Sequence, residues 1–169
     1  MFNRREFMAA SAVLAASCTA CRRDSYGFLK GTDAATLKAL CDQIIPADEF
    51  PSAAQAGVLT YIDLQLAGPY RRHQKTYREG LKKANELTRS RFGVDLAQAS
   101  SQQQFQIVSA IEKDDKAFFD LVRAHTMQGY YGTPRHGGNR DAVSWRMLGL
   151  DEPPLRGRAQ YDLRKGSDA

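Results

Sequence analysis

The chain has 169 residues, of which 43% are hydrophobic and 25% are charged, and its formal net charge is +5. This length and composition predict one globular domain and exclude a wholly disordered chain and a protein with several membrane spans. The basic residues are mixed with acidic ones, as where Arg78 precedes Glu79, which favours a solvated helix face over a groove for nucleic acid. A basic face toward anionic lipid or an acidic partner stays open.

Residues 1–21 are expected to be an export signal. Arg4 and Arg5 precede Phe7 and a run of small and apolar residues. This run is too short to cross a bilayer, which takes roughly 20 apolar residues. Paired arginines before such a run are typical of twin-arginine signals, which export proteins that are already folded. The alternative is an ordinary secretory signal that happens to contain two arginines.

The signal ends in small residues followed by Cys18, a pattern that resembles a bacterial lipobox. Cys18 would then become the first residue of the mature chain and carry the lipid, and Cys21 is a weaker candidate. Two or more acyl chains hold a protein firmly on a membrane. Cleavage near Ala20, which would leave a soluble periplasmic protein, stays open as the alternative.

After a linker at residues 22–31, apolar residues recur at helical spacing through most of residues 32–150. Thr32 is the expected N-cap of a first helix that ends at Pro46. A second helix should run from about Val58 to Gly68, and a long third one over residues 70–91.

Two further helices complete the predicted bundle. Ser100 and Gln103 have the spacing of a capping box ahead of the apolar residues Phe105, Val108 and Ile111. The last helix is expected over residues 114–127, with Phe118, Phe119, Val122 and His125 on its inner side. The fold class is therefore all-α, an irregular bundle of about five helices followed by an ordered, glycine-rich loop.

No set of residues predicts catalysis, cofactor binding or a metal site in this chain. The three histidines lack ligand spacing, and His125 is interpreted as a partly buried histidine with a hydrogen-bond partner. Cys41 is the one cysteine outside the signal and is expected to be buried and structural. Asp48 and Glu49 are adjacent, which favours a solvated turn over an acid–base pair.

The stretch GYYGTPRHGGNRDAVSW, at residues 129–145, holds four glycines and the single tryptophan. Glycines permit a tight loop with positive φ angles, and tyrosine, tryptophan and arginine are the residues that dominate protein interfaces. Two interpretations stay open, a surface that binds a partner and a loop that covers the end of the bundle. The candidate interface residues are Gly129, Tyr130, Tyr131, Pro134, Arg135, Gly137, Gly138, Asn139, Arg140 and Trp145.

Three features together resemble the gluconate 2-dehydrogenase subunit 3 family. They are the twin-arginine signal, the helix TLKALCDQIIP and the segment HTMQGYYGTPRHGGNRDAVSWRMLGL. The likeness covers residues 32–149 and is strongest from His125 onward, and residues 151–169 are expected to be a tail. Members of this family are small subunits of membrane-bound, flavin-dependent dehydrogenases that oxidise the CH–OH groups of sugars and sugar acids.

The resemblance implies a large FAD-binding subunit of the glucose-methanol-choline type as the partner. In many such complexes a third subunit, a c-type cytochrome with haem c, passes the electrons on to quinone. The large subunit commonly lacks a signal and is exported through the twin-arginine pathway while bound to the small one. We therefore expect a non-catalytic subunit at the periplasmic side of the inner membrane, needed for export, maturation and stability of the flavoprotein.

A lipid on Cys18 would depart from the family pattern, in which the cytochrome usually anchors the complex, so a complex of two subunits stays open. The alternative function is a stand-alone periplasmic lipoprotein that binds a sugar acid through Arg135 and Arg140, because arginine pairs well with carboxylates. A binder of nucleic acid or of a lipid surface is the weakest candidate.

Overall fold

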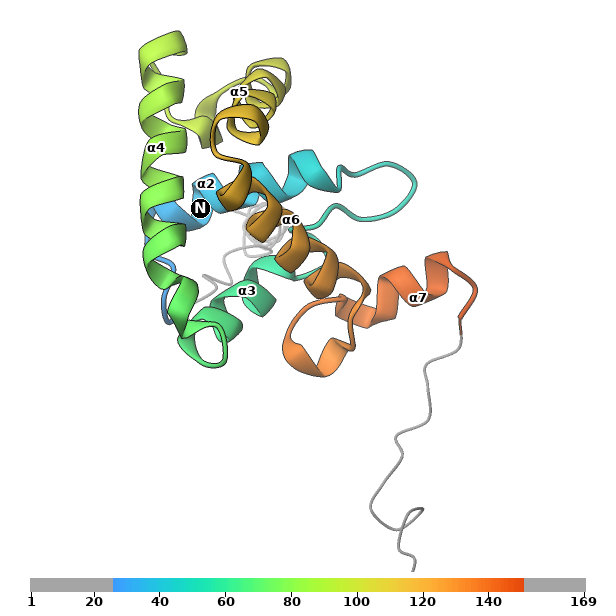
Figure 1. The fold of residues 1–169 in the computed structure, drawn as a ribbon. Helices are drawn as coiled ribbons and strands as arrows, with labels where there is room; N and C mark the ends of the chain where they lie inside the picture. Colours follow the sequence, from blue (N-terminus) through green and yellow to red (C-terminus); the bar gives the residue numbers. More distant parts are fainter. Residues whose placement is uncertain (1–25, 151–169) are drawn as a thin grey trace, which may run out of the picture.

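The computed structural model describes residues 26–150, and within that range the chain forms six α-helices and no strand. Short 3-10 turns precede or follow several of them. The predicted all-α class is confirmed. The predicted signal at residues 1–21 and the tail at 151–169 lie outside the described residues. The helices are α2 (Thr32–Ile44), α3 (Val58–Ala67), α4 (Gln74–Phe92), α5 (Ser101–Asp114), α6 (Lys116–Tyr131) and α7 (Val143–Met147) (Figure 1).

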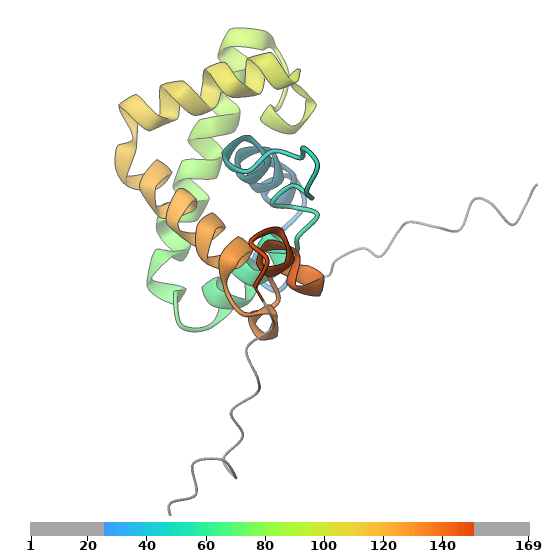
Figure 2. The same cartoon turned by 90° about the vertical axis from the view of Figure 1, so that its right-hand side faces the viewer.

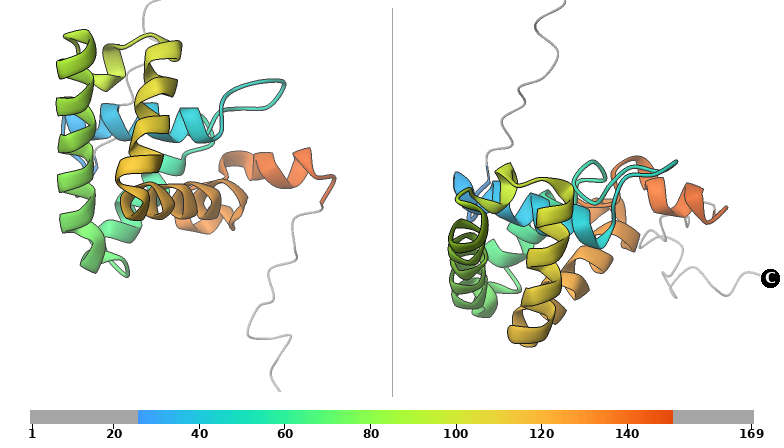
Figure 3. Two further views of the ribbon diagram at one scale, coloured as in Figure 1. Left: turned by 45° about the horizontal axis from the view of Figure 1, so that its top comes forward. Right: turned by 90° about the horizontal axis from the view of Figure 1, so that it is seen from above.

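Helix α2 lies in the middle of the bundle and contacts α3, α4, α5 and α6, whereas α7 extends from one side (Figures 1 and 3). The core therefore forms around α2, whose Leu37, Leu40 and Cys41 are all buried. Burying one such aliphatic side chain stabilises the fold by about 1.5–3 kcal/mol. Within residues 26–150, no helix has the length and apolar character needed to cross a bilayer.

Close contact between α4 and α6 depends on Gly80. A Cβ atom at this position would lie 2.3 Å from the Phe118 ring, so the ring packs against bare backbone. Tyr77 and Leu81 of α4 are fully buried, and the Tyr77 ring lies edge-on to the Phe118 ring, 6.1 Å between centroids. The neighbouring Phe105 of α5 is 62% exposed, although we expected it on the apolar face with Val108 and Ile111.

Local signals place most of the helix ends. The Ser100 hydroxyl accepts a hydrogen bond from the Gln103 amide and the Gln103 side chain accepts one from the Ser100 amide, which confirms the capping box. Gly93 ends α4 in the left-handed conformation. The prediction for Thr32 is wrong, because the N-cap of α2 is Gly31, with φ 47°, and Thr32 is already helical.

Two further helix boundaries differ from the prediction. Helix α4 begins at Gln74 and not at residue 70, and a 3-10 turn at Arg71–His73 precedes it. Helix α6 extends to Tyr131, not to Met127, so three residues that we assigned to the loop are helical. Gly129 is tolerated there because it packs against Tyr61, whose ring would lie 2.9 Å from a Cβ atom.

The segment ahead of α2 is attached to α3 by the buried Asp63. Its carboxylate accepts hydrogen bonds from the backbone amides of Gly27 (2.7 Å), Phe28 (2.9 Å) and Leu29 (2.8 Å). Three amide donors satisfy the buried charge, which would otherwise be costly. This clamp fixes the place at which the described chain enters the bundle.

Candidate partner-binding site

The turn after α6, at residues 132–142, packs on the bundle through backbone contacts that only glycine permits. A Cβ atom on Gly138 would lie 2.1 Å from the carbonyl oxygen of Gly129 in α6. A Cβ atom on Gly57, in the connection between α2 and α3, would lie 2.9 Å from the carbonyl oxygen of Gly137. These glycines let the turn approach both α6 and the connection at residues 46–57.

Asn139 holds the turn closed from the inside. It is fully buried, and its amide group donates to the carbonyl of Gly132 (2.8 Å) and accepts from the amide of Ser144 (3.0 Å). One side chain thus joins the start of the turn to the start of α7. Asparagine suits this position because its φ of 45° lies in the left-handed region, which asparagine tolerates better than most residues.

Three further hydrogen bonds hold the end of α6, the turn and α7 to one another and to the connection at residues 46–57. The Tyr130 hydroxyl donates to the carbonyl of Pro51 (2.8 Å), and the Arg140 amide donates to the carbonyl of Ala56 (2.8 Å). The Trp145 indole donates to the carbonyl of Tyr131 (3.0 Å). The turn, the end of α6 and α7 therefore behave as one ordered unit, which Figure 2 shows face on with α7 in front.

The backbone of this unit is strained. Besides Asn139, Asp141 (φ 56°) and Ala142 (φ 52°) have left-handed conformations, and these are the only non-glycine residues with positive φ among residues 26–150. Each costs of order 1–3 kcal/mol unless its surroundings compensate. The buried hydroxyl of Ser144 also lacks a hydrogen-bond partner in this part of the chain. Clustered strain of this kind points to a shape that is needed for function.

The candidate interface residues separate into two groups by exposure. Gly129, Tyr130, Gly138 and Asn139 are buried, so they shape the turn and cannot contact a partner directly. Pro134, Gly137 and Trp145 are half-buried, and Tyr131, Arg135 and Arg140 are exposed. The stretch therefore covers the end of the bundle and also presents side chains to solvent, and partner binding by the exposed residues stays a prediction.

Exposed apolar side chains lie at the same end of the molecule, and of these only Tyr131 was among the predicted interface residues. Six large hydrophobic residues are exposed within residues 26–150. Five of them belong to α3, to α6 or to the residues after α7, and the sixth is Phe105. Met127 and Tyr131 are one turn apart on α6. Two features of the sequence could have predicted this exposed apolar surface. They are the spacing of Met127 and Tyr131 and the sequence Met-Leu-Gly-Leu after Arg146. The α6–α7 surface, as we use the term, comprises Met127, Tyr131, Trp145, Leu148 and Leu150.

The buried histidine His125 lies among aromatic rings. The ring of His125 is nearly parallel to those of Tyr70 (4.6 Å between centroids) and Tyr77 (5.8 Å), and the Tyr77 hydroxyl lies 2.9 Å from His125 Nδ1. Burial, with smaller effects of His73 and Arg72, lowers the pKa of His125 to about 4. Burial thus favours the neutral form of His125. No group of three His, Cys, Asp or Glu residues in the described chain could hold a metal ion.

Two further sequence predictions about side chains agree with the structure. Cys41 is fully buried 3.3 Å from the Thr126 hydroxyl, and burial raises the pKa of its thiol to about 12, so the prediction of a structural cysteine is confirmed. Asp48 and Glu49 are exposed in a turn. The proposed signal residues Arg4, Arg5 and Phe7 and the proposed lipid site Cys18 lie outside the described residues.

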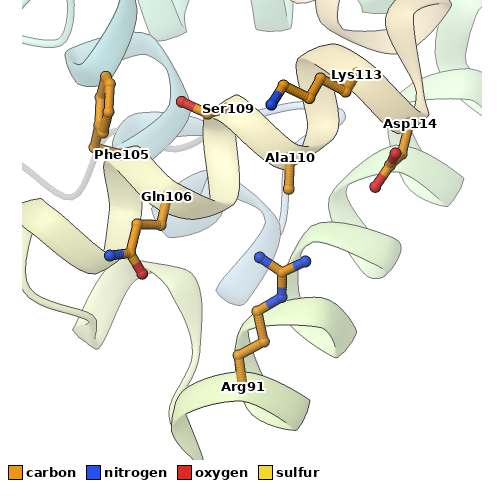
Figure 4. A pocket seen from close by; sticks show the side chains of 7 residues that line it. All are labelled: Arg91, Phe105, Gln106, Ser109, Ala110, Lys113 and Asp114. Carbon is orange, nitrogen blue, oxygen red and sulfur yellow. The ribbon is translucent and has the colours of Figure 1, made fainter.

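A pocket of about 430 Å³ between α4 and α5 lies away from the α6–α7 surface. Its lining residues do not converge on a common point. Figure 4 shows Arg91 directed toward Ala110, whereas Phe105, Ser109 and Lys113 project from other sides of α5. Ligand sites need polar groups that converge, so this pocket is not the candidate site.

The comparisons with known proteins agree with the geometry and the sequence motifs. A family model described as gluconate 2-dehydrogenase subunit 3 matches residues 32–151. No curated protein and no solved structure matches the chain significantly. The matched range spans all six helices and the turn that supports the α6–α7 surface. The chain therefore belongs to the gluconate 2-dehydrogenase subunit 3 family and, as a dehydrogenase subunit, is part of a complex with other subunits.

Proposed function

We propose that this chain is the non-catalytic small subunit of a periplasmic, membrane-associated, FAD-dependent dehydrogenase for gluconate or a related sugar. It escorts a large flavoprotein subunit of the glucose-methanol-choline type through the twin-arginine pathway and then stabilises it. FAD and substrate oxidation belong to the large subunit, and haem c belongs to a cytochrome subunit where one is present. The complex works at the periplasmic side of the inner membrane.

The observation that carries this proposal is the α6–α7 surface. Large apolar side chains are exposed there beside a strained turn, which hydrogen bonds of Asn139 and Arg140 hold in one shape. Protein interfaces are anchored by tyrosine and tryptophan side chains surrounded by apolar contacts, and a stable interface buries about 800 Å² on each partner. We assign the α6–α7 surface as the dock for the flavoprotein.

The chemistry of the described chain supports a non-catalytic role. Its buried histidine and cysteine have pKa values displaced from neutrality in the direction that keeps each group uncharged. Neither can act as an efficient proton carrier near neutral pH. Exposed Arg135 and Arg140 remain available for a rim of polar contacts around the apolar centre of the interface.

The residues ahead of the described chain suggest how the complex is exported and held at the membrane. Arg4 and Arg5 would direct the folded pair of subunits to the twin-arginine pathway, which accepts folded cargo. A lipid on Cys18 would then hold the complex at the membrane. The escort role explains why a subunit without catalytic groups carries the export signal.

Fractionation of host cells tests the escort role. In cells with Arg4→Lys/Arg5→Lys, we expect both this chain and the flavoprotein to stay in the cytoplasm, and periplasmic dye reduction with gluconate or another sugar to disappear. The matched control is Arg22→Lys/Arg23→Lys, a second arginine pair outside the expected signal, which should leave export unchanged. Export of the flavoprotein in cells with the first variant would contradict the proposal.

A further inference from the structure

A pocket of about 330 Å³ lies where the described chain enters the bundle, between the first residues and the start of α4. Lys30, Arg71 and Arg78 contribute three cationic groups to its lining, and Gln74 adds a neutral amide. The Asp63 clamp holds Gly27 and Phe28 at the rim. We call it the N-terminal pocket.

The three cations of the N-terminal pocket have no carboxylate partner within ion-pair distance in the part of the chain that the structure describes. The Arg78 guanidinium instead lies over the ring of Phe28, 4.9 Å from its centroid. Asp63 is buried behind the rim, and its carboxylate is already taken by three amides. The pocket is therefore net positive and suits an anionic group.

The position of the pocket along the chain identifies the source of that anion. Gly27 follows Cys18 by nine positions, and a chain of nine residues spans at most about 30 Å. A lipid on Cys18 would therefore keep the N-terminal pocket close to the membrane surface. Phospholipid phosphates are the anions concentrated there.

The two surfaces can be used at the same time. Residues 26–31 and α4 lie on one side of the bundle and α7 on the opposite side in both Figure 1 and Figure 3. A membrane under the N-terminal pocket would leave the α6–α7 surface facing away from the lipid and toward the flavoprotein.

We propose that Lys30, Arg71 and Arg78 bind the phosphate group of an anionic phospholipid and thereby set the orientation of this subunit on the membrane. The inference rests on the membrane-associated part of the proposed function and adds to it a specific lipid contact. Each Lys or Arg near an anionic surface strengthens binding roughly fivefold, so three together amount to roughly 100-fold.

The test is flotation of the full-length chain with vesicles of phosphatidylcholine, with or without phosphatidylglycerol. A lipid tether or signal inserts into both kinds of vesicle, so the ratio of the two affinities isolates the headgroup contact. The site variant is Lys30→Gln/Arg71→Gln/Arg78→Gln. The control, Lys83→Gln/Arg89→Gln/Arg123→Gln, removes the same charge from three cations that are exposed and paired with carboxylates.

We expect the site variant to lose roughly 100-fold of the preference for phosphatidylglycerol and the control to lose no more than roughly fivefold. Arg71→Gln alone, at an exposed position, should lose roughly fivefold and guards against misfolding of the triple variant. Equal losses in the site variant and the control, or no preference in the wild type, would overturn the inference.

Two further measurements separate this inference from its rivals. Calorimetry with inorganic phosphate should show no binding below millimolar concentration, and tight binding would reassign the pocket to a soluble anion. Co-purification of the flavoprotein with the site variant should be unchanged. If the wild type binds no flavoprotein but keeps its lipid preference, the escort proposal fails and the lipid contact stands.

Discussion

Gly138 offers the sharpest test of how the turn is built. In Gly138→Ala the new methyl group would lie 2.1 Å from the carbonyl oxygen of Gly129, and ordinary contact begins at 3.4 Å. The backbone of the turn fixes the position of the methyl group, and the backbone of α6 fixes the carbonyl oxygen. No side-chain rotation can therefore relieve the overlap. The turn must move away from α6 by about 1 Å.

That displacement would break two hydrogen bonds of the turn, each now 2.8 Å long. They join the Arg140 amide to the carbonyl of Ala56 and the Asn139 side chain to the carbonyl of Gly132. Buried groups left without partners cost about 1–3 kcal/mol each, so we expect a loss of about 3 kcal/mol. For a domain of this size, that lowers the unfolding temperature by roughly 10 °C.

Thermal unfolding followed by circular dichroism measures this loss on the full-length chain. The matched control is Gly27→Ala, where a Cβ atom would lie 3.6 Å from the Asp63 carboxylate and needs no movement. The control should unfold within about 2 °C of the wild type. An unfolding temperature for Gly138→Ala equal to that of the control would refute the close approach of the turn to α6.

Three further predictions follow from single residues. Ala142→Gly should stabilise the fold by about 0.5–1 kcal/mol in urea unfolding, because it relieves the left-handed strain at φ 52°. The control Ala124→Gly, on the exposed side of α6, should destabilise the fold by about 1 kcal/mol. If both substitutions changed the free energy of unfolding in the same direction, the strain at Ala142 would be refuted. Burial lowers the pKa of His125 from 6.5 to about 4, so between these pH values the unfolded chain binds more protons than the folded one. The free energy of unfolding should therefore fall by up to about 2 kcal/mol between pH 7 and pH 5, and His125→Gln should reduce that fall; an unchanged fall would place the effect elsewhere. Burial raises the pKa of the Cys41 thiol to about 12, so iodoacetamide at pH 8 should leave the Cys41 peptide unlabelled until the protein is denatured, and mass spectrometry of the native protein would reveal any contrary labelling.

The parts of the fold that sequence predicted well are those fixed by neighbouring residues. Ser100 and Gln103 cap α5 through atoms three residues apart, and the Tyr77–Leu81–Ala84 spacing on α4 is enough to find its buried face. Thr32 shows the limit of such signals, because Gly31 can occupy the N-cap position equally well and no threonine side-chain bond forms there.

Contacts between distant segments could not be predicted from the sequence. Gly129 has low helix propensity, yet it is helical because Tyr61, 68 positions earlier, packs against its backbone. The Asp63 clamp joins residues at least 34 positions apart. The division of the candidate interface into buried and exposed residues likewise needed coordinates, since Tyr130 and Tyr131 are neighbours in sequence with opposite environments.

The most direct test of the escort role is a pull-down of the tagged full-length chain from membranes of its own host in mild detergent. The eluate is scanned for flavin absorbance and assayed for dye reduction by gluconate and other sugars. Tyr131→Ala/Leu148→Ala removes two side chains of the α6–α7 surface, and the control Phe105→Ala removes an exposed aromatic ring elsewhere.

We expect the wild type and the Phe105→Ala control to yield a yellow, active eluate that contains a large flavoprotein. The double variant should retain roughly one-thirtieth of the flavin or less, because the loss of an interface anchor costs about 2 kcal/mol or more. A colourless, inactive eluate with a single protein band from the wild type would contradict the escort role and would favour a stand-alone sugar-acid-binding lipoprotein.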